Sequence, residues 1–526
     1  MVDQTARKKN PRSNGDRLRR RRLSERFFRS AAICAVGLVM SMLALIIYSV
    51  ATLSIRAFTH NQIVVSLTPA LDSILSIDRG NVADSAKTLS ALNKLVADEI
   101  DRELARDTII ASDETGFARA RLFAPVAVSH IAEVITKNPN RLGQTRSYRV
   151  PISSNLDLYL KGQLTDQNIW RIAETGIADH NMILSSDSAS EFKISIAQGV
   201  PEPVLRALSQ SNETRPSVFL ETQSAVFKVD AYRDDHLSLR VMAGELADLK
   251  GGVWLRVVWT PAAQRAISDQ QIAEVNLLKR KGIIRSAFHP RLWTSADSTF
   301  PELAGVLSAL VGSLLVLLVT AFVAVPIGVM AAIWLEEFAP RSRLTEFIEI
   351  SINNLAAVPP IVFGLLGAAV LLNVFGLPRS APVAGGLVLA FLTLPTVIIA
   401  SRAALSAVPN DIRIAAFSLG ASRMQVAMDH VLPAAAPGVI TGVILGLARS
   451  LGEVAPLLLI GMVIFVGEVP DGINDEATTL PVLIYKWSTG AERAWEPLTA
   501  AAIVILLLIM VLINLFMSYV RQRFER

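Results

Sequence analysis

Two ionisable residues, Arg449 and Glu453, lie inside an apolar run of the C-terminal third of the chain. On a helix, residues four apart lie one turn apart on the same face, so this pair can form an ion pair or face a polar path. A charge in the middle of a bilayer costs at least about 2.5 kcal/mol, and such residues are usually functional. The planar arginine fork suits the oxygens of an oxyanion. We therefore predict that the pair faces a polar path through the membrane. A purely structural ion pair is the alternative.

Three glycines precede this pair at intervals of four residues, Gly438, Gly442 and Gly446. A row of glycines removes side chains from one helix face and lets a second helix pack against the backbone. Arg449 and Glu453 continue this row in the sequence. We therefore predict a single membrane helix over residues 438–466 that packs closely along its first half and carries both charges on the same face.

A polar helix pair is predicted immediately before this membrane helix, over residues 409–433. Asn410 or Asp411 can cap a first helix, and Gly420 stands where that helix should end. A second short helix should begin at Ser422 and end at Pro433. The apolar residues of the pair are small (Ala415, Ala416, Ala421) or flexible (Met424, Met428), which allows close approach to a partner groove and suits the pair to docking on another protein. An amphipathic helix that rests on the membrane surface is the alternative.

The spacing in this pair resembles the coupling loop of ABC-importer permeases, in which two alanines, a glycine and a Leu-Pro form helices that seat in the ATPase subunit. Two positions differ from the family pattern, since Ile414 replaces its glutamate and His430 replaces an aliphatic residue. The positions that match the pattern are Ala415, Ala416, Gly420, Leu432 and Pro433.

Residues 448–458 resemble the corresponding helix of the PstA-type permeases of bacterial phosphate ABC importers, and the resemblance extends over about residues 301–520. It implies a type I ABC permease fold and a translocation path shared with a PstC-like second permease. It further implies a PstB-like ATPase dimer, a PstS-like phosphate-binding protein and inorganic phosphate as substrate. With a transported anion implied in this way, we predict that Arg449 contacts the phosphate and that Glu453 positions Arg449 or closes the path. The permease itself needs no cofactor, because ATP is bound by the separate ATPase.

The composition agrees with an integral membrane protein, since 52% of the 526 residues are hydrophobic and 18% are charged. The net charge of +5 is concentrated beside apolar segments, which indicates membrane topology and lipid contact rather than a nucleic-acid partner. The single cysteine, Cys34, excludes an intrachain disulfide and a cysteine-based metal site. The chain has no phosphate-binding loop of the form G-x-x-x-x-G-K-[ST], so ATP must be hydrolysed elsewhere.

The positive-inside rule gives a predicted topology for a bacterial inner (plasma) membrane protein with both termini cytoplasmic. Residues 1–30 form a basic cytoplasmic tail without predicted regular structure, 31–55 the first transmembrane helix, 56–300 an extracytoplasmic α/β domain and 521–526 a second basic cytoplasmic tail. The permease domain covers 301–520, with the coupling helices of 409–433 in the cytoplasm. Its predicted spans cover residues 303–335, 348–372, 383–405, 438–466 and 498–520, which makes about six spans in all.

The inserted domain is predicted to be mixed α/β, although the resemblance implies no role for it. Helical patterns cover residues 81–106, 116–137 and 260–281, and strand patterns cover 148–152, 156–160, 217–231, 236–241 and 252–259. No paired acids, catalytic triad or metal-ligand set is visible in it. His130, His236 and His289 are therefore interpreted as structural or surface residues.

Three other functions compete with phosphate import. A permease of the same fold for another oxyanion or small solute has the same coupling loop. A membrane sensor shares the layout of one span, an external domain and a second span, but the four further spans argue against it. A membrane enzyme is disfavoured by the absence of a catalytic group set.

Overall fold

The structure is a computed structural model, and it describes residues 12–67, 96, 100, 122–123, 146–173, 185–188, 191–195, 200–210, 214–233, 236–244, 252–462 and 465–524. Five of the described helices are long and apolar enough to cross a membrane, and a bent pair raises the number to six if it counts as one span. This agrees with the predicted number of spans. The five are α1 (Arg12–Ile55), α10 (Leu307–Ile333), α13 (Pro382–Ser406), α16 (Leu432–Leu451) with the turns before it, and α19 (Trp495–Phe524).

The predicted span over residues 348–372 is wrong as a single straight helix. The chain forms α11 (Arg343–Ala356) and α12 (Pro360–Gly367), bent by 100° relative to each other. Pro359 and Pro360 explain the break, because proline disfavours helical geometry in the residue before it and donates no backbone hydrogen bond. A π turn, η6 (Ala368–Leu372), continues α12.

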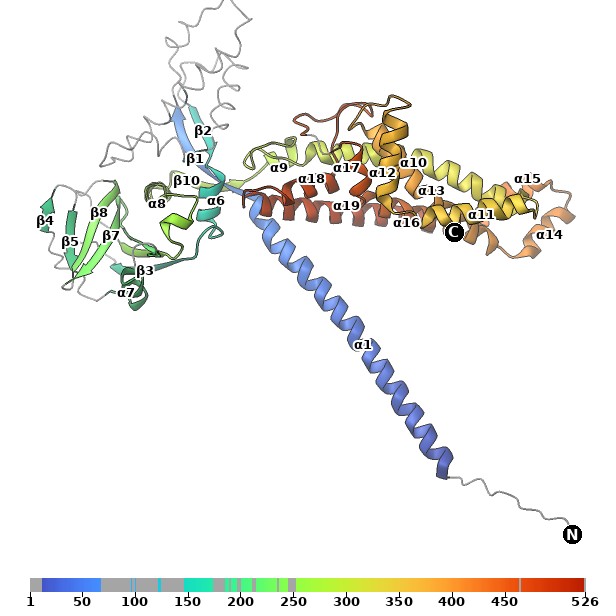
Figure 1. Ribbon diagram of the computed structural model, residues 1–526, viewed down its shortest axis with the longest axis horizontal. Coiled ribbons are helices and arrows are strands. Elements are labelled where there is room, and N and C mark those ends of the chain that lie inside the picture. Colours follow the sequence, from blue (N-terminus) through green and yellow to red (C-terminus); the bar gives the residue numbers. More distant parts are fainter. Residues whose placement is uncertain are drawn as a thin grey trace, which may run out of the picture.

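The first helix also differs from its prediction. α1 begins at Arg12, so helical structure extends through basic residues for which no regular structure was predicted. Its C-terminal end lies beside α19, whereas most of its length runs away from the other helices (Figure 1). No residue in its most apolar window is buried within the chain.

The remaining helices form a bundle in which α10 packs on α13, α13 on α16, and α16 on α19. Glycines permit these approaches: a Cβ atom on Gly312 would lie 2.1 Å from the carbonyl oxygen of Thr478, and one on Gly386 would lie 2.5 Å from Val319. The short helices α17 (Ala455–Leu459) and α18 (Leu480–Ser488) pack on α12 and α19, respectively.

The inserted region is mixed α/β, as predicted, and contains two antiparallel sheets. The three-stranded sheet has the order β10-β1-β2 and the seven-stranded sheet the order β3-β9-β6-β7-β8-β5-β4. Helix α8 (Asp269–Arg280) covers part of the larger sheet. The strands are β1 (Thr59–Leu67), β2 (Arg146–Pro151), β3 (Gln167–Ala173), β4 (Ser185–Ser188), β5 (Glu191–Ser195), β6 (Ser217–Glu221), β7 (Ala225–Arg233), β8 (His236–Gly244), β9 (Val253–Val258) and β10 (Ile284–Phe288).

The strand patterns at 148–152, 236–241 and 252–259 are confirmed, and the pattern at 217–231 is two strands rather than one. The strand predicted at 156–160 is wrong: it is helix α6 (Ser154–Leu160), on which Leu156 and Tyr159 are both buried three residues apart. The helix predicted from residue 260 begins only at Asp269, where Ser268 and Gln271 form a capping box. The helices predicted at 81–106 and 116–137 fall largely outside the described residues.

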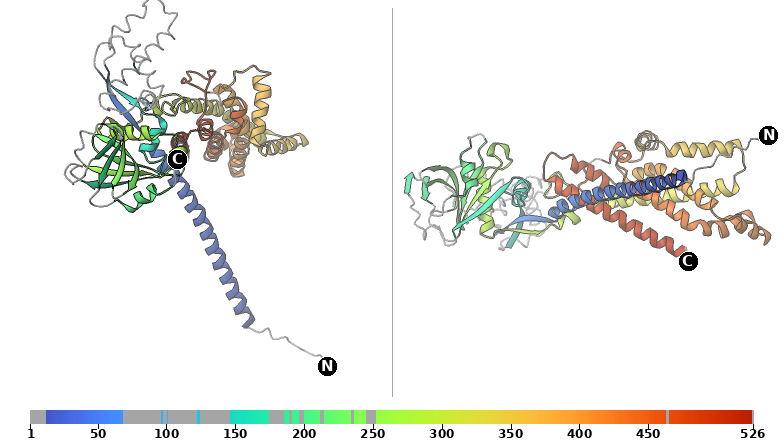
Figure 2. Two further views of the ribbon diagram at one scale, coloured as in Figure 1. Left: turned by 60° about the vertical axis from the view of Figure 1, so that its left-hand side comes forward. Right: turned by 90° about the horizontal axis from the view of Figure 1, so that it is seen from below.

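The α/β domain and the helix pair α14 (Asn410–Ser418) and α15 (Arg423–Gln425) lie at opposite ends of the bundle (Figures 1 and 2). A third helix, α7 (Glu202–Leu208), packs on the larger sheet. Short segments α9 (Arg291–Thr294), η1 (Arg56–Phe58), η4 (Ala262–Gln264) and η5 (Trp334–Phe338) complete the described elements.

Candidate transport and coupling sites

Arg449 and Glu453 lie at the end of α16 that is nearer the α/β domain. Arg449 is in the last helical turn, and its Nε is 3.7 Å from Oε1 of Glu453, too long for a hydrogen bond. The Arg449 side chain is 56% exposed and that of Glu453 is 22% exposed. Among the described residues Arg449 has no closer partner. Most of its guanidinium is therefore free to contact another molecule.

The prediction of one helix over residues 438–466 is wrong. α16 ends at Leu451, with Gly452 as its C-cap, so Glu453 follows the helix instead of lying on its face. Pro456 stands in the first turn of α17, so a new helix begins there, and the break between the helices falls at residues 452–454. The ion pair consequently bridges a helix end and the loop that follows it.

The glycine row of α16 faces α13 within the same chain. A Cβ atom would lie 2.7 Å from that of Ala404 at Gly438 and 2.3 Å from that of Ala400 at Gly442. At Gly446 it would lie 2.9 Å from the Thr393 side chain.

Ser450, which is 1% exposed, continues this row four residues after Gly446. The prediction that Arg449 continues it is therefore wrong, because Arg449 is offset by one residue and is exposed.

The helix pair at the other end of the bundle begins at the predicted position, but its first cap and its end differ from the prediction. α14 has Pro409 as its N-cap without a side-chain hydrogen bond, so neither Asn410 nor Asp411 caps it. Gly420 follows the end of α14 with a φ of 84°, a conformation that favours glycine. Ser422 forms a capping box with Gln425 at the start of the second helix.

That second helix does not stop at Pro433. α15 continues through a π turn, η7 (Val426–Val431), into α16. A π turn shifts the backbone hydrogen bonds by one residue, and this shift accommodates a proline within a continuous helix. The membrane helix and the second helix of the pair are therefore one element over Arg423–Leu451.

The five residues that match the coupling loop are divided between the interior and the surface. Ala416 is 4% exposed and packs with Val426 and Val431, and Leu432 is half-buried in the same cluster. Ala415, Gly420 and Pro433 are exposed. Ala416 is therefore covered by its own chain, whereas Leu432 is only partly covered.

Large apolar side chains form the exposed surface of the pair, which we name the end patch. Sequence analysis identified its two methionines as flexible apolar residues and Ile414 as a departure from the family pattern, but it did not identify Phe417 or Leu419. The end patch comprises Ile414 (55% exposed), Phe417 (47%), Leu419 (87%), Met424 (61%) and Met428 (43%). Exposed apolar residues gathered on one helix pair are typical of a surface that contacts another protein or a membrane.

Ion pairs that the sequence analysis did not find fix this end of the bundle. Arg413 of α14 contacts Glu337 at 2.7 Å and donates hydrogen bonds to the carbonyl oxygens of Val408 and Leu405. Arg402 of α13 contacts Glu349 of α11 at 2.9 Å. Both arginines are therefore occupied by structural contacts.

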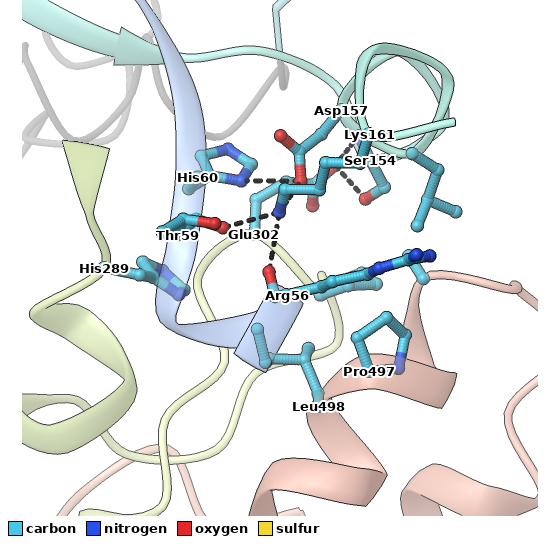
Figure 3. A pocket seen from close by; sticks show the side chains of 14 residues that line it. Arg56, Thr59, His60, Ser154, Asp157, Lys161, His289, Glu302, Pro497 and Leu498 are labelled. Carbon is cyan, nitrogen blue, oxygen red and sulfur yellow. Dashed lines mark hydrogen bonds and ion pairs between the residues drawn. The ribbon is translucent and has the colours of Figure 1, made fainter. Parts of the chain in front are cut away.

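A polar cluster joins the α/β domain to the bundle (Figure 3). Lys161, the C-cap of α6, contacts Asp157 at 2.6 Å and donates a hydrogen bond to the carbonyl oxygen of Arg56 at 2.9 Å, just beyond α1. Ser154 donates its backbone N–H to Glu302, which precedes α10, at 2.7 Å. The small cavity between them has a volume of about 40 Å³. We name these contacts the junction.

Two histidines line the junction, His60 and His289, with ring centroids 5.5 Å apart. Burial alone would raise the pKa of Asp157, but His60 at 3.3 Å and Lys161 outweigh it and hold that pKa well below its usual range. Burial, with a smaller contribution from His60, lowers the pKa of His289 to about 4. His289 is buried, in agreement with a structural role. The described residues contain no group of side chains suited to a metal ion.

Two family descriptions match the chain. "Domain of unknown function (DUF3333)" matches residues 15–169, and "Binding-protein-dependent transport system inner membrane component" matches residues 324–526. The second match and the apolar helices define the chain as an ABC transporter permease, a multi-pass protein of the inner membrane.

The similar proteins identify the family within this class. The chain is 32% identical to the phosphate transport system permease protein PstA of Haemophilus influenzae over 225 residues, 43% of this chain and 78% of the relative. It is 36% identical to PstA of Mycobacterium leprae over 231 residues, 43% of this chain and 74% of the relative. The chain belongs to the PstA family of phosphate transport permeases. Membership of this family agrees with a function in transport, and it argues against the membrane sensor and the membrane enzyme considered as alternatives.

Among solved structures, the methionine ABC transporter MetNI in an inward-facing conformation is similar over 41% of this chain and 94% of that chain, with 18% identity and a TM-score of 0.34.

Proposed function

We propose that this chain is a permease subunit of an ATP-driven phosphate importer. The observation that carries the proposal is the identity of 32–36% to PstA permeases across the helical half of the chain. The position of Arg449 supports it, because an exposed guanidinium at the end of a membrane helix can bind phosphate oxygens through two parallel hydrogen bonds.

The translocation path forms between this chain and a PstC-like second permease. The exposed apolar faces of α1 and α19 and the free guanidinium of Arg449 give that subunit a surface to cover. Phosphate released by a PstS-like binding protein then descends past Arg449, while Glu453 positions the arginine or closes the path between cycles. Alternating access moves the phosphate, because the site opens first to one side of the membrane and then to the other.

The end patch and the exposed Ala415, Gly420 and Pro433 dock on a PstB-like ATPase dimer. Because the second helix of the pair is continuous with α16, movement of the docked pair reaches Arg449 through one element, Arg423–Leu451. Closure of the ATPase dimer around ATP would thus move the helix that carries the anion contact. The ATPase binds ATP, and this chain needs no cofactor.

This mechanism places the helix pair in the cytoplasm and the α/β domain outside the membrane, with both termini cytoplasmic. The position of the pair and the domain at opposite ends of the bundle supports this arrangement (Figure 1). Reporters inserted after Arg233 and at Ser422 should therefore respond on opposite sides of the membrane. Detection of both on one side would contradict the topology.

The substrate is tested by uptake. The chain is produced with its ATPase, second permease and binding protein in a strain that lacks its own PstA-type permease, and uptake of radiolabelled phosphate is measured. We expect uptake that unlabelled phosphate suppresses and sulfate does not. If the strain takes up sulfate or another solute but not phosphate, the result would favour a permease of the same fold for that solute.

A further inference from the structure

A second cationic cavity lies in the α/β domain, far from Arg449 in the chain. It is an open cavity with a volume of about 360 Å³, lined by residues of α6, β3, β9 and α8. Its lining comprises Tyr159, Leu160, Gln167, Ile169, Arg256, Asn276, Lys279 and Arg280. The volume is within the range of small-molecule sites.

Positive charge in this cavity exceeds negative charge. Arg256 and Arg280 both contact a single fully buried carboxylate, Glu221, at 2.5 Å each. Lys279 adds a third cation at the exposed edge. Among the described residues Glu221 is the sole carboxylate that pairs with the two arginines, and Lys279 has no ion pair, so two positive charges are not neutralised. An anion in the cavity would neutralise them.

The arginines are held in place before any ligand arrives. The Cζ of Arg280 lies 3.9 Å from the centroid of the Trp254 ring, and Nη1 of Arg256 donates to Gln167 at 2.7 Å. Asn276 donates to the Tyr159 hydroxyl at 3.1 Å. Rigid donors lose little entropy on binding, which favours a specific ligand over a diffuse ion cloud.

Hydrogen-bond donors remain unused in this arrangement. Among the described residues, Nη1 of Arg280 and Nζ of Lys279 have no acceptor. Burial lowers the pKa of Lys279, and the charge of Arg256 lowers it further. A bound anion would raise the pKa of Lys279 again, and it would accept hydrogen bonds from the side chains of Arg280 and Lys279.

We propose that this cavity binds an oxyanion of the phosphate type, either as free phosphate or as the phosphate group of a small ester. Leu160 and Ile169 form an apolar wall that leaves room for the body of an ester. This site is distinct from the transport path and lies in a domain whose amino-terminal part matches a family of unknown function. The proposal depends on the geometry of the α/β domain and not on the proposed transport function.

The test uses the full chain, purified in lipid nanodiscs without its ATPase. The chain carries Arg449→Gln, so that the transport path contributes no phosphate binding. Radiolabelled inorganic phosphate is the probe in equilibrium dialysis. We expect saturable binding that Lys279→Gln weakens about tenfold, the loss typical of one charge-assisted hydrogen bond. Arg280→Gln should weaken it at least as much.

Lys281→Gln is the matched control, because Lys281 is exposed, two residues further along and outside the cavity lining. It should bind phosphate like the parent chain. Unlabelled glycerol 3-phosphate and unlabelled phosphate are then compared as competitors of the radiolabelled phosphate. If glycerol 3-phosphate displaces the label at the lower concentration, the ligand is an ester; if unlabelled phosphate does, the ligand is free phosphate. Absence of saturable binding at millimolar phosphate, or equal binding by Lys279→Gln and the parent, would overturn the proposal. Lys279 is exposed, so its replacement is compatible with folding.

Discussion

Arg449 and Arg413 show how differently two arginines of one bundle are used. Arg413 is 17% exposed, contacts Glu337 at 2.7 Å and donates to two backbone carbonyls, so every side of its guanidinium is engaged. Arg449 is 56% exposed and lies 3.7 Å from its nearest carboxylate. The first arginine fixes α14 to the membrane helices, whereas the second keeps its donors available. The difference indicates that an arginine of the bundle is a candidate ligand contact only when its own chain leaves its hydrogen-bond donors without acceptors.

The largest expected effect comes from the available arginine. Arg449→Gln should reduce phosphate uptake by at least about 100-fold, because the charge-assisted hydrogen bonds to the anion are lost. Arg449→Lys should retain part of the activity, since lysine offers a point charge without the planar fork. Uptake is measured at equal membrane levels of each variant. Thermal stability should be unchanged, and a large decrease in it would remove the contrast with Arg413.

The structural arginine should behave in the opposite way. Arg413→Met should destabilise the protein by about 3 kcal/mol, because the carboxylate of Glu337, 12% exposed, loses its partner. Thermal unfolding in detergent measures the loss. Arg413→Met combined with Glu337→Leu should recover most of it, since no charge is then left unpaired. Failure of the second change to restore stability would show that the backbone contacts of Arg413, rather than the ion pair, hold α14.

A smaller effect is expected in the packed half of α16. Gly442→Ala should cost about 2 kcal/mol, because the added methyl group would lie 2.3 Å from that of Ala400 and force the helices apart. Gly37→Ala in α1 is the matched control, since nothing lies within 4 Å of the added atom. Equal stability of the two variants would contradict close packing of α13 on α16.

The smallest effect concerns the junction. The pKa of His289 is lowered to about 4 in the folded state from 6.5 in the unfolded state, so the unfolded chain binds more protons between these values. Stability is therefore complete above pH 6.5 and falls as the pH decreases toward 4. Acidification from pH 7.5 to pH 5.5 should cost about 1 kcal/mol through this residue. His289→Gln should lessen the pH dependence of thermal stability, and an unaltered dependence would exclude His289 as its source.

The residues that sequence reasoning located correctly are those with strong local signals. Gly420 and Ser422 mark helix ends through their own backbone chemistry, and the apolar runs identify the spans that form single helices, α1, α10, α13 and α19. Composition alone also separated the α/β domain from the bundle.

The errors arose where tertiary contacts override a local pattern. The alternating leucines of residues 156–160 suggested a strand, yet burial against α8 and β1 makes them a helix. Pro433 was interpreted as a helix end because the sequence gives no sign of the π turn that accommodates it. The buried position of Ala416 and the partners of Arg413 depend on residues distant in sequence. The cationic cavity joins four separate segments and has no local signal.

The most direct test of the account measures phosphate uptake by the double variant Arg449→Gln, Glu453→Gln beside the single variant Arg449→Gln. If Arg449 binds the anion in the path, neutralising Glu453 cannot replace the missing donors, and the double variant should be as inactive as the single one. If the two residues form a static pair, removing both charges leaves none uncompensated, and uptake should recover. Recovery toward the wild-type rate would contradict the account and assign the pair a structural role.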